Sequence, residues 1–157
     1  DAGRTMDRGR LYARGRIGIL VPKGSALKAD GELKDLAQAL QDGRVRRFAI
    51  ANPEHAPYGM RAREALQHAG LWQASQATQF ATSGSTQGGI VAQSLALAPS
   101  VARLGDFALI PETWHQPLTQ RMVLMKGAPE GARAFYEHLA TPAAQAVMRR
   151  YGFELPR

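Results

Sequence analysis

Residues 48–59 hold the pattern in this sequence that most clearly predicts chemistry, and the groups involved are backbone amides rather than reactive side chains. The stretch reads Phe-Ala-Ile-Ala-Asn-Pro-Glu-His-Ala-Pro-Tyr-Gly. Its first part, 48–51, is apolar and predicts a short buried strand, which Pro53 ends because proline cannot continue a sheet ladder. Pro57 stands where the first turn of a helix tolerates proline, and a helical pattern follows to Gly70.

The helix that begins at Pro57 lacks a good capping residue. His55 or Ala56 falls at its N-cap, where Ser, Thr, Asp or Asn would normally accept hydrogen bonds from the first amides. An uncapped helix N-terminus at the carboxyl end of a sheet suits an anion. The alternative interpretation is an ordinary turn between strand and helix whose amides bind water, and these residues alone leave both open.

Side chains that could catalyse a reaction or bind a metal do not form a recognisable motif. The sequence has no cysteine, which excludes disulfides and thiolate chemistry. None of its histidines has a partner at the spacing of metal ligands (His55, His68, His115 and His138). Glu54 beside His55 is a poor acid–base pair, because neighbours in sequence seldom point the same way. The sequence therefore predicts a binding protein with no resident cofactor, and not an enzyme.

The composition is that of a globular domain with excess positive charge. The chain has 157 residues, 45% of them hydrophobic and 21% charged, and a net charge of +7. Its cationic residues gather at 4–16, 44–47 and 149–150, without the basic stripe interleaved with aromatics that is typical of nucleic-acid binding. We therefore expect no nucleic-acid partner. No apolar run approaches the roughly 20 residues needed to cross a bilayer, and a secretion signal would have to lie outside these residues.

Alternating strand and helix patterns surround the 48–59 stretch. Residues 16–22 predict a buried strand, and a helix capped by Asp30 and stopped by Gly43 follows. Its apolar residues recur at helical spacing (Leu33, Leu36, Ala37 and Leu40). With the strand at 47–51 and the helix from Pro57 this gives a β-α-β-α order, which predicts a parallel sheet with helices on its faces.

After Gly70 the alternation is interrupted. Residues 75–84 predict a second helix in series, with Ser75 as its cap and no strand before it. Either the fold departs from the alternation here, or residues are missing between Trp72 and Ser75.

The later elements are predicted at 88–91, 106–110 and 120–125 for strands and at 129–139 and 141–152 for helices. The first of these helices is expected to bury four apolar residues (Ala132, Phe135, Tyr136 and Leu139). The second is expected to use Thr141 as its cap and Pro142 as its first residue.

Three stretches carry a resemblance to a known family. They are 48–59 with the following Arg63–Leu66, then Ala77–Ala92, and Thr141–Phe153. Together they resemble the periplasmic molybdate-binding proteins of ABC transporters, over essentially the whole chain. The resemblance implies an α/β, periplasmic-binding-protein-like fold with two lobes joined by a hinge. It also implies a tetrahedral oxyanion, molybdate or tungstate, held by amide and hydroxyl donors rather than by Lys or Arg.

The resemblance also implies where the ion would be bound. Tyr58 falls on a position that contacts the ion, next to Pro57 at the start of the helix, so that its N–H and O–H could both reach an oxyanion. Ala74, with Ser75 beside it, occupies the place nearest to a second contact. The family has a further strand before that second contact, and this chain departs from the family by lacking it.

The family likeness divides the chain into three parts. Residues 1–15 are expected to approach the hinge as a remnant of the first lobe, 16–115 to form a nearly complete second lobe, and 116–157 to return to the first lobe. The N-terminal half of that first lobe, with its hydroxyl donors, has no counterpart here. We expect a truncated chain, or else a dimer or swapped assembly in which another copy supplies the missing surface.

The resemblance predicts an extracytoplasmic, periplasmic solute receptor that captures molybdate or tungstate and presents it to an inner-membrane ABC permease. The alternative is an oxyanion-sensing effector domain of a transcription regulator, which shares this lobe architecture.

Overall fold

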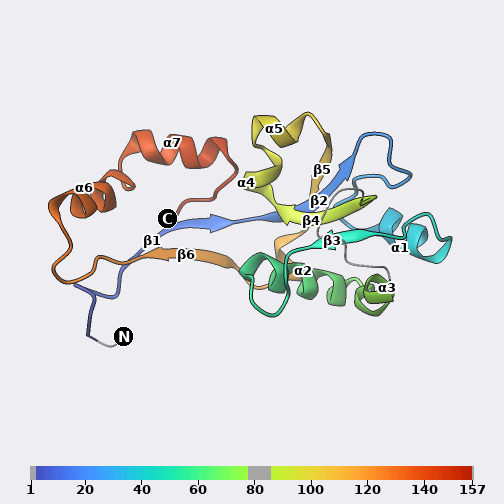
Figure 1. Cartoon of the computed structure of the whole chain (residues 1–157), viewed down its shortest axis with the longest axis horizontal. Helices are drawn as coiled ribbons and strands as arrows, with labels where there is room; N and C mark the ends of the chain where they lie inside the picture. The colour runs from blue at the N-terminus through green and yellow to red at the C-terminus, as the bar shows by residue number, and fades with distance from the viewer. Residues whose placement is uncertain (1–2, 78–85, 157) are drawn as a thin grey trace. The chain divides into compact units, whose positions relative to one another are not determined.

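The computed structural model describes residues 3–77 and 86–156, which form two compact units (Figure 1). Unit 1 combines residues 1–15 with 119–157, and unit 2 is the continuous segment 16–118. The chain therefore passes between the units twice, after Gly15 and after Leu118. The divisions expected from the sequence were after residues 15 and 115.

Unit 2 is built on a four-stranded mixed sheet. Its strands are β2 (Ile17–Pro22), β3 (Phe48–Ile50), β4 (Gly88–Ala92) and β5 (Gly105–Leu109), in the order β3-β4-β2-β5. β3 and β4 are parallel, with Phe48 opposite Gly88, whereas β2 is antiparallel to both β4 and β5. The predicted parallel sheet is therefore wrong. A β-α-β-α pattern shows that a helix separates two strands, but it does not show that they pair, and here β4 lies between β2 and β3.

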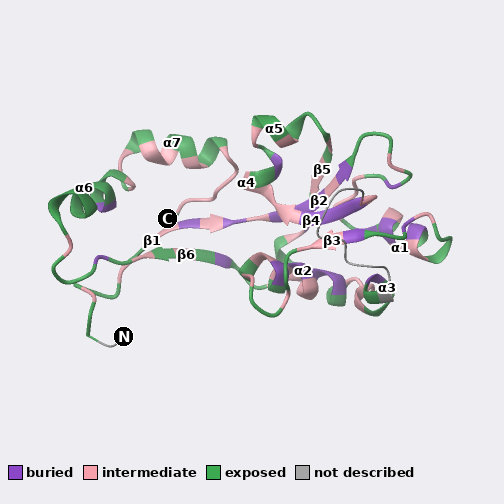
Figure 2. Cartoon of the chain, in the orientation of Figure 1, coloured by how far each residue is buried: buried purple, intermediate pink, exposed green. Residues whose placement is uncertain are grey.

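The helices of unit 2 differ in how much they bury. They are α1 (Lys34–Gln41), α2 (Pro57–His68), α3 (Trp72–Ala77), α4 (Gln93–Ala96), α5 (Pro99–Ala102) and the short 3₁₀ helix η1 (Glu112–Trp114). α2 packs on β2 and β4 and buries Ala62, Ala65 and Leu66, while α4 buries only Ala96 (Figure 2). The core of the unit lies between α1, α2 and the sheet, with Phe48 fully buried.

Asp30 does begin the first helix, although not from the N-cap position. The N-cap is Leu33, and the Asp30 carboxylate reaches over it to accept hydrogen bonds from the amides of Lys34 (2.8 Å) and Asp35 (3.3 Å). Asp30 therefore does bind the first amides of the helix, but a turn over residues 30–33 lies between it and the first helical residue.

The prediction that Ser75 caps a helix is wrong. Ser75 lies inside α3 and is fully buried, its amide donates to the Leu71 carbonyl (2.9 Å), and its hydroxyl donates to the Trp72 carbonyl (2.8 Å). Inside a helix a serine hydroxyl can donate to a backbone carbonyl of the preceding turn. The sequence alone therefore does not distinguish a serine that caps a helix from one that lies within it. The rest of the predicted helix, 78–84, lies outside the described residues.

Unit 1 contains a two-stranded sheet and two helices. They are β1 (Arg10–Gly15), β6 (Leu118–Met122, whose first residue still belongs to unit 2), α6 (Glu130–His138) and α7 (Pro142–Arg150). An isolated bridge between Thr5 and Met125 prolongs the strand pair. The sequence predicted a strand at 120–125, which begins two residues after β6 and ends three residues after it. It did not predict β1, because residues 10–15 alternate too weakly to distinguish a strand from a linker.

Much of unit 1 is exposed. Tyr136 is the buried residue of α6, whereas Phe135 is 63% exposed and Ala132 is also exposed. The prediction that all the apolar residues of this helix are buried is therefore wrong. Helical periodicity identifies an apolar face, but the described part of unit 1 does not supply a layer that covers it.

Candidate functional site

The first turn of α2 has the uncapped start that the sequence predicts. Ala56 is the N-cap residue in an extended conformation, and no side chain caps the helix from that position. Pro57 has no N–H, and Met60 donates to the Ala56 carbonyl at 2.9 Å. The two amides between them belong to Tyr58 and Gly59, at the end of the helix dipole that favours negative charge.

The loop before α2 uses its amides locally. The Asn52 side-chain oxygen accepts from the amides of Glu54 (2.8 Å) and His55 (3.2 Å), and the Asn52 carbonyl accepts from Ala56 (2.9 Å). Asn52 therefore orders the turn between β3 and α2 and leaves the helix itself without a side-chain cap.

Gly59 permits the close approach of α2 to the end of β3. A Cβ at this position would collide with the carbonyl oxygens of Ala51 and Asn52. Glycine is therefore required because the helix start lies directly against the loop backbone, and this contact fixes the first amides of α2 at the carboxyl end of β3.

The four residues predicted to contact the ion lie in two helices: Pro57 and Tyr58 begin α2, and Ala74 and Ser75 lie in α3. Tyr58 is half-buried and packs against the hydrophobic core, and the neighbouring Pro57 is exposed. Ala74 is exposed on α3, next to the buried Ser75, and α3 follows the C-terminal end of α2 (Figure 1). Pro57 and Tyr58 are thus brought together, whereas Ala74 and Ser75 lie near the other end of α2.

Cationic side chains on α2 are engaged in ion pairs. Arg63 Nη1 lies 2.8 Å from Glu54 Oε1, and Arg61 Nη1 lies 3.2 Å from Glu64 Oε1. Both arginines of α2 are therefore already paired with carboxylates of unit 2. That an anion is held by amide and hydroxyl donors at this helix start stays a prediction.

A second group of polar contacts on α2 was not predicted from the sequence. Glu64 Oε2 accepts from the amide of Gln116 at 2.7 Å, and the His68 ring stacks on Trp114 with ring centroids 4.8 Å apart. Glu64 and His68 are four residues apart and share one face of the helix, which is the only signal that the sequence offered.

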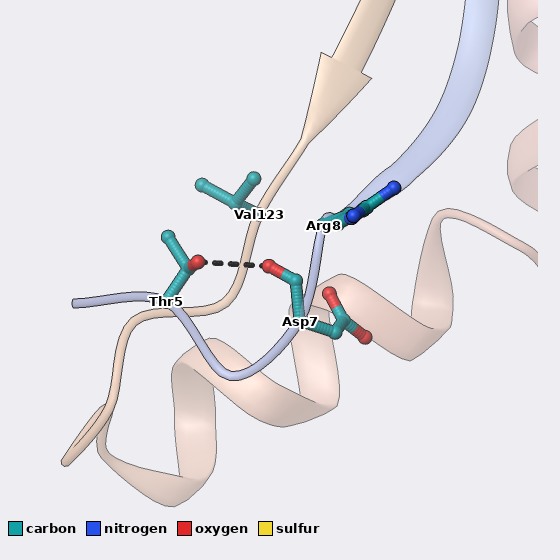
Figure 3. A pocket seen from close by; sticks show the side chains of 4 residues that line it. All are labelled: Thr5, Asp7, Arg8 and Val123. Atoms are coloured by element: carbon teal, nitrogen blue, oxygen red, sulfur yellow. Dashed lines mark hydrogen bonds between the residues drawn. The ribbon is translucent and has the colours of Figure 1, made fainter. Parts of the chain in front are cut away.

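Two described pockets lie away from the start of α2. One, of about 380 Å³, is lined by Glu64, Thr113, Trp114, His115 and Gln116. The other, of about 420 Å³, belongs to unit 1 and is lined by Thr5, Asp7, Arg8 and Val123 (Figure 3). In Figure 3 the Thr5 hydroxyl donates to the Asp7 carbonyl at 2.8 Å, so this wall of the pocket is a local turn.

The described residues do not form a metal centre or a membrane span. No three or more His, Asp or Glu side chains among them are grouped so that they could hold a metal ion. No helix in this part of the chain is both long enough and apolar enough to cross a bilayer.

Comparison with known proteins gives relatives that share this fold. Molybdate-binding protein ModA of Rhodobacter capsulatus is 31% identical over 144 residues, which cover 83% of this chain and 50% of the relative. ModA of Escherichia coli is 30% identical over 122 residues, 69% of this chain and 46% of the relative. The chain therefore spans about half the length of these curated relatives.

Solved structures show the same architecture, and a family model covers nearly the whole chain. The periplasmic molybdate-binding protein of Azotobacter vinelandii superposes with a TM-score of 0.79 at 25% identity, over 99% of this chain and 72% of that one. Peb3 from Campylobacter jejuni superposes with a TM-score of 0.70 at 19% identity, over 98% of this chain and 72% of that one, which shows the fold alone. Residues 1–154 match the model of the family described as bacterial extracellular solute-binding protein. With its periplasmic-binding-protein-like α/β fold, this chain belongs to the family of bacterial extracellular solute-binding proteins.

Proposed function

We propose that this chain binds molybdate or tungstate at the first turn of α2, as part of an extracytoplasmic receptor for an ABC importer. The observation that carries the proposal is the uncapped N-terminus of α2 at the carboxyl end of β3, in a chain whose relatives are named molybdate-binding proteins. Membership of an extracellular solute-binding family favours this receptor over the effector domain of a transcription regulator.

The chemistry of the ion fits the donors at this helix start. Molybdate and tungstate are tetrahedral dianions that stay deprotonated at neutral pH, so a pocket for them needs donors and no acceptor. The amides of Tyr58 and Gly59 lie at the positive end of the helix dipole, and the Tyr58 hydroxyl would add a donor whose bond to an anion is charge-assisted. Selection against sulfate would depend on cavity size, because the anions share shape and charge. In this proposal the protein performs no chemical step on its ligand.

Ala74 and Ser75 remain part of the proposal only as a secondary contact. The Ser75 amide donates to Leu71, just before α3, and its hydroxyl donates to Trp72 at the start of α3, so a ligand would have to displace these bonds. Ala74 is exposed and offers backbone contact alone. We therefore assign the principal role to Tyr58, beside Pro57.

The proposed function is tested by ligand binding to the wild-type chain and to Tyr58→Phe. Isothermal titration calorimetry should show molybdate and tungstate bound more tightly than sulfate or phosphate. Removing the phenolic hydroxyl should weaken molybdate binding by about tenfold or more, since hydrogen bonds to charged groups contribute roughly 1.5–3 kcal/mol and about 1.4 kcal/mol is a factor of ten. The matched control is Tyr12→Phe, because the Tyr12 hydroxyl donates to Gln120 in unit 1 and is not part of the site. Equal affinity of wild type and Tyr58→Phe would remove the hydroxyl from the site, and no binding by wild type would overturn the function.

A further inference from the structure

Glu64, in the middle of α2, connects that helix to the segment that leaves unit 2. Glu64 Oε2 accepts from the backbone amide of Gln116 at 2.7 Å, and its Oε1 pairs with Arg61 at 3.2 Å. The Arg61 and Glu64 side chains are 15% and 31% exposed, so both are partly shielded from water. A carboxylate that accepts both from a guanidinium and from an amide makes charge-assisted bonds, which are the stronger kind.

The same segment is held at two further points. His68, one turn beyond Glu64, stacks on Trp114 at a centroid distance of 4.8 Å and an interplanar angle of 26°. Glu112 Oε1 lies 3.5 Å from Arg16 Nε, and Arg16 is the first residue of unit 2 after the chain enters it. Residues 112–116 therefore contact α2 through Gln116 and Trp114, and they contact Arg16, where unit 2 begins, through Glu112.

We propose that Glu64 is a positioning residue for the oxyanion site, because it fixes the exit segment 112–118 to the helix whose first turn binds the ion. This inference depends on the proposed function. Tyr58 and Glu64 lie on one α-helix, about 9 Å apart along its axis at 1.5 Å per residue, so a movement of α2 as a rigid body would displace both. We therefore expect molybdate at Tyr58 to stabilise the bond between Glu64 and Gln116, and because coupling between two sites is reciprocal, that bond would then raise the affinity for molybdate.

The first test uses the chain without ligand. In Glu64→Ala, hydrogen–deuterium exchange of the Gln116 amide should become about tenfold faster, since the loss of roughly 1.4 kcal/mol corresponds to a factor of ten. Glu64→Gln keeps an acceptor oxygen for the amide and should restore most of the protection. Glu54→Ala is the matched control: it breaks the ion pair with Arg63 at the start of the same helix and should leave exchange at 112–118 unchanged.

The second test adds molybdate. In wild type the ion should slow exchange at 112–118, and in Glu64→Ala that slowing should disappear while the Kd for molybdate rises about tenfold. Glu64→Gln should recover both effects. Far-UV circular dichroism of each variant shows whether it is folded before these values are compared.

The outcomes separate this inference from the proposed function. Faster exchange in Glu64→Ala with an unchanged Kd would mean that Glu64 has only a structural role, and would overturn the inference. Unchanged exchange in the free Glu64→Ala chain would overturn it as well. If wild type does not bind molybdate, the proposed function fails and the positioning role fails with it, whereas the exchange rates of the free chain still report whether Glu64 holds the segment.

Discussion

The two units of this protein differ in how completely each buries its own apolar residues. Of the nineteen buried apolar residues in the described part of the chain, sixteen belong to unit 2, and Ala13, Leu124 and Tyr136 belong to unit 1. The large exposed hydrophobic residues divide evenly, although unit 1 is about half as long as unit 2. Burial of apolar surface is the main force in folding, so the described residues of unit 1 have far less to hold them together.

The two units also differ in net charge, and this difference too disfavours unit 1. Among the described residues, unit 1 has nine Lys and Arg against four Asp and Glu, while unit 2 has ten against eight. Unit 1 thus carries a net +5 and unit 2 a net +2. A small unit with much unbalanced positive charge is destabilised by self-repulsion, which adds to its deficit in buried apolar surface.

The largest expected effect tests the difference in burial. Leu66→Ala should destabilise the protein by about 2–5 kcal/mol, because it leaves a cavity under α2 in the core of unit 2. Phe135→Ala should change stability by less than about 0.5 kcal/mol, because its ring on α6 is 63% exposed. Urea unfolding followed by far-UV circular dichroism measures both. A large loss in Phe135→Ala would contradict the comparison, since it would mean that the ring is covered in solution.

The sequence predicted the elements of unit 2 well, because their signals are local. The apolar run at 48–51, the proline at position 57 and the periodic leucines after Asp30 each specify a strand or a helix, and β3, α2 and α1 lie where these signals placed them. The mixed strand order could not be predicted in the same way. Pairing depends on contacts between distant segments, such as Ile19 with Ile90, and nothing within either strand specifies it.

Around the candidate site, the local feature could be predicted from the sequence and the tertiary contacts could not. The uncapped start of α2 follows from the identities of Ala56 and Pro57, which are neighbours in the chain. The burial of Ser75 inside α3, where it does not cap the helix, and the unpredicted bond from Gln116 to Glu64 both depend on tertiary packing. Whether Tyr58 contacts an oxyanion stays a prediction until binding is measured.

An intermediate effect concerns the polar network of unit 2 and its response to acid. The pKa of Asp35 is lowered from its ordinary value, chiefly because its carboxylate accepts from the Lys28 amide at 2.7 Å and also because it is bonded to Arg44. A carboxyl whose pKa is lower in the folded state contributes stability above its unfolded pKa of about 3.9 and loses it as pH falls through the folded value.

The stability advantage of wild type over Asp35→Asn should therefore be full at neutral pH and should shrink as the pH falls below about 4. Urea unfolding at a series of pH values measures it. Asp42→Asn is the control, because it removes a partner of Arg44 but keeps the bond between Lys28 and Asp35. An advantage of wild type over Asp35→Asn that does not vary with pH would show that Asp35 acts through packing rather than charge.

The smallest expected effect lies in unit 1 and shows whether the two units respond separately. The Thr141 hydroxyl accepts from the Ala144 amide at 3.3 Å and caps α7, as its sequence predicted. Thr141→Ala should cost about 0.5–1 kcal/mol, near the low end for a lost cap because this bond is long. Hydrogen–deuterium exchange should become faster across residues 142–150 and stay unchanged in α2, and Thr141→Ser should restore the protection. An equal increase of exchange in α2 would mean that the two units unfold together. The smaller buried core of unit 1 would then not make it less stable than unit 2.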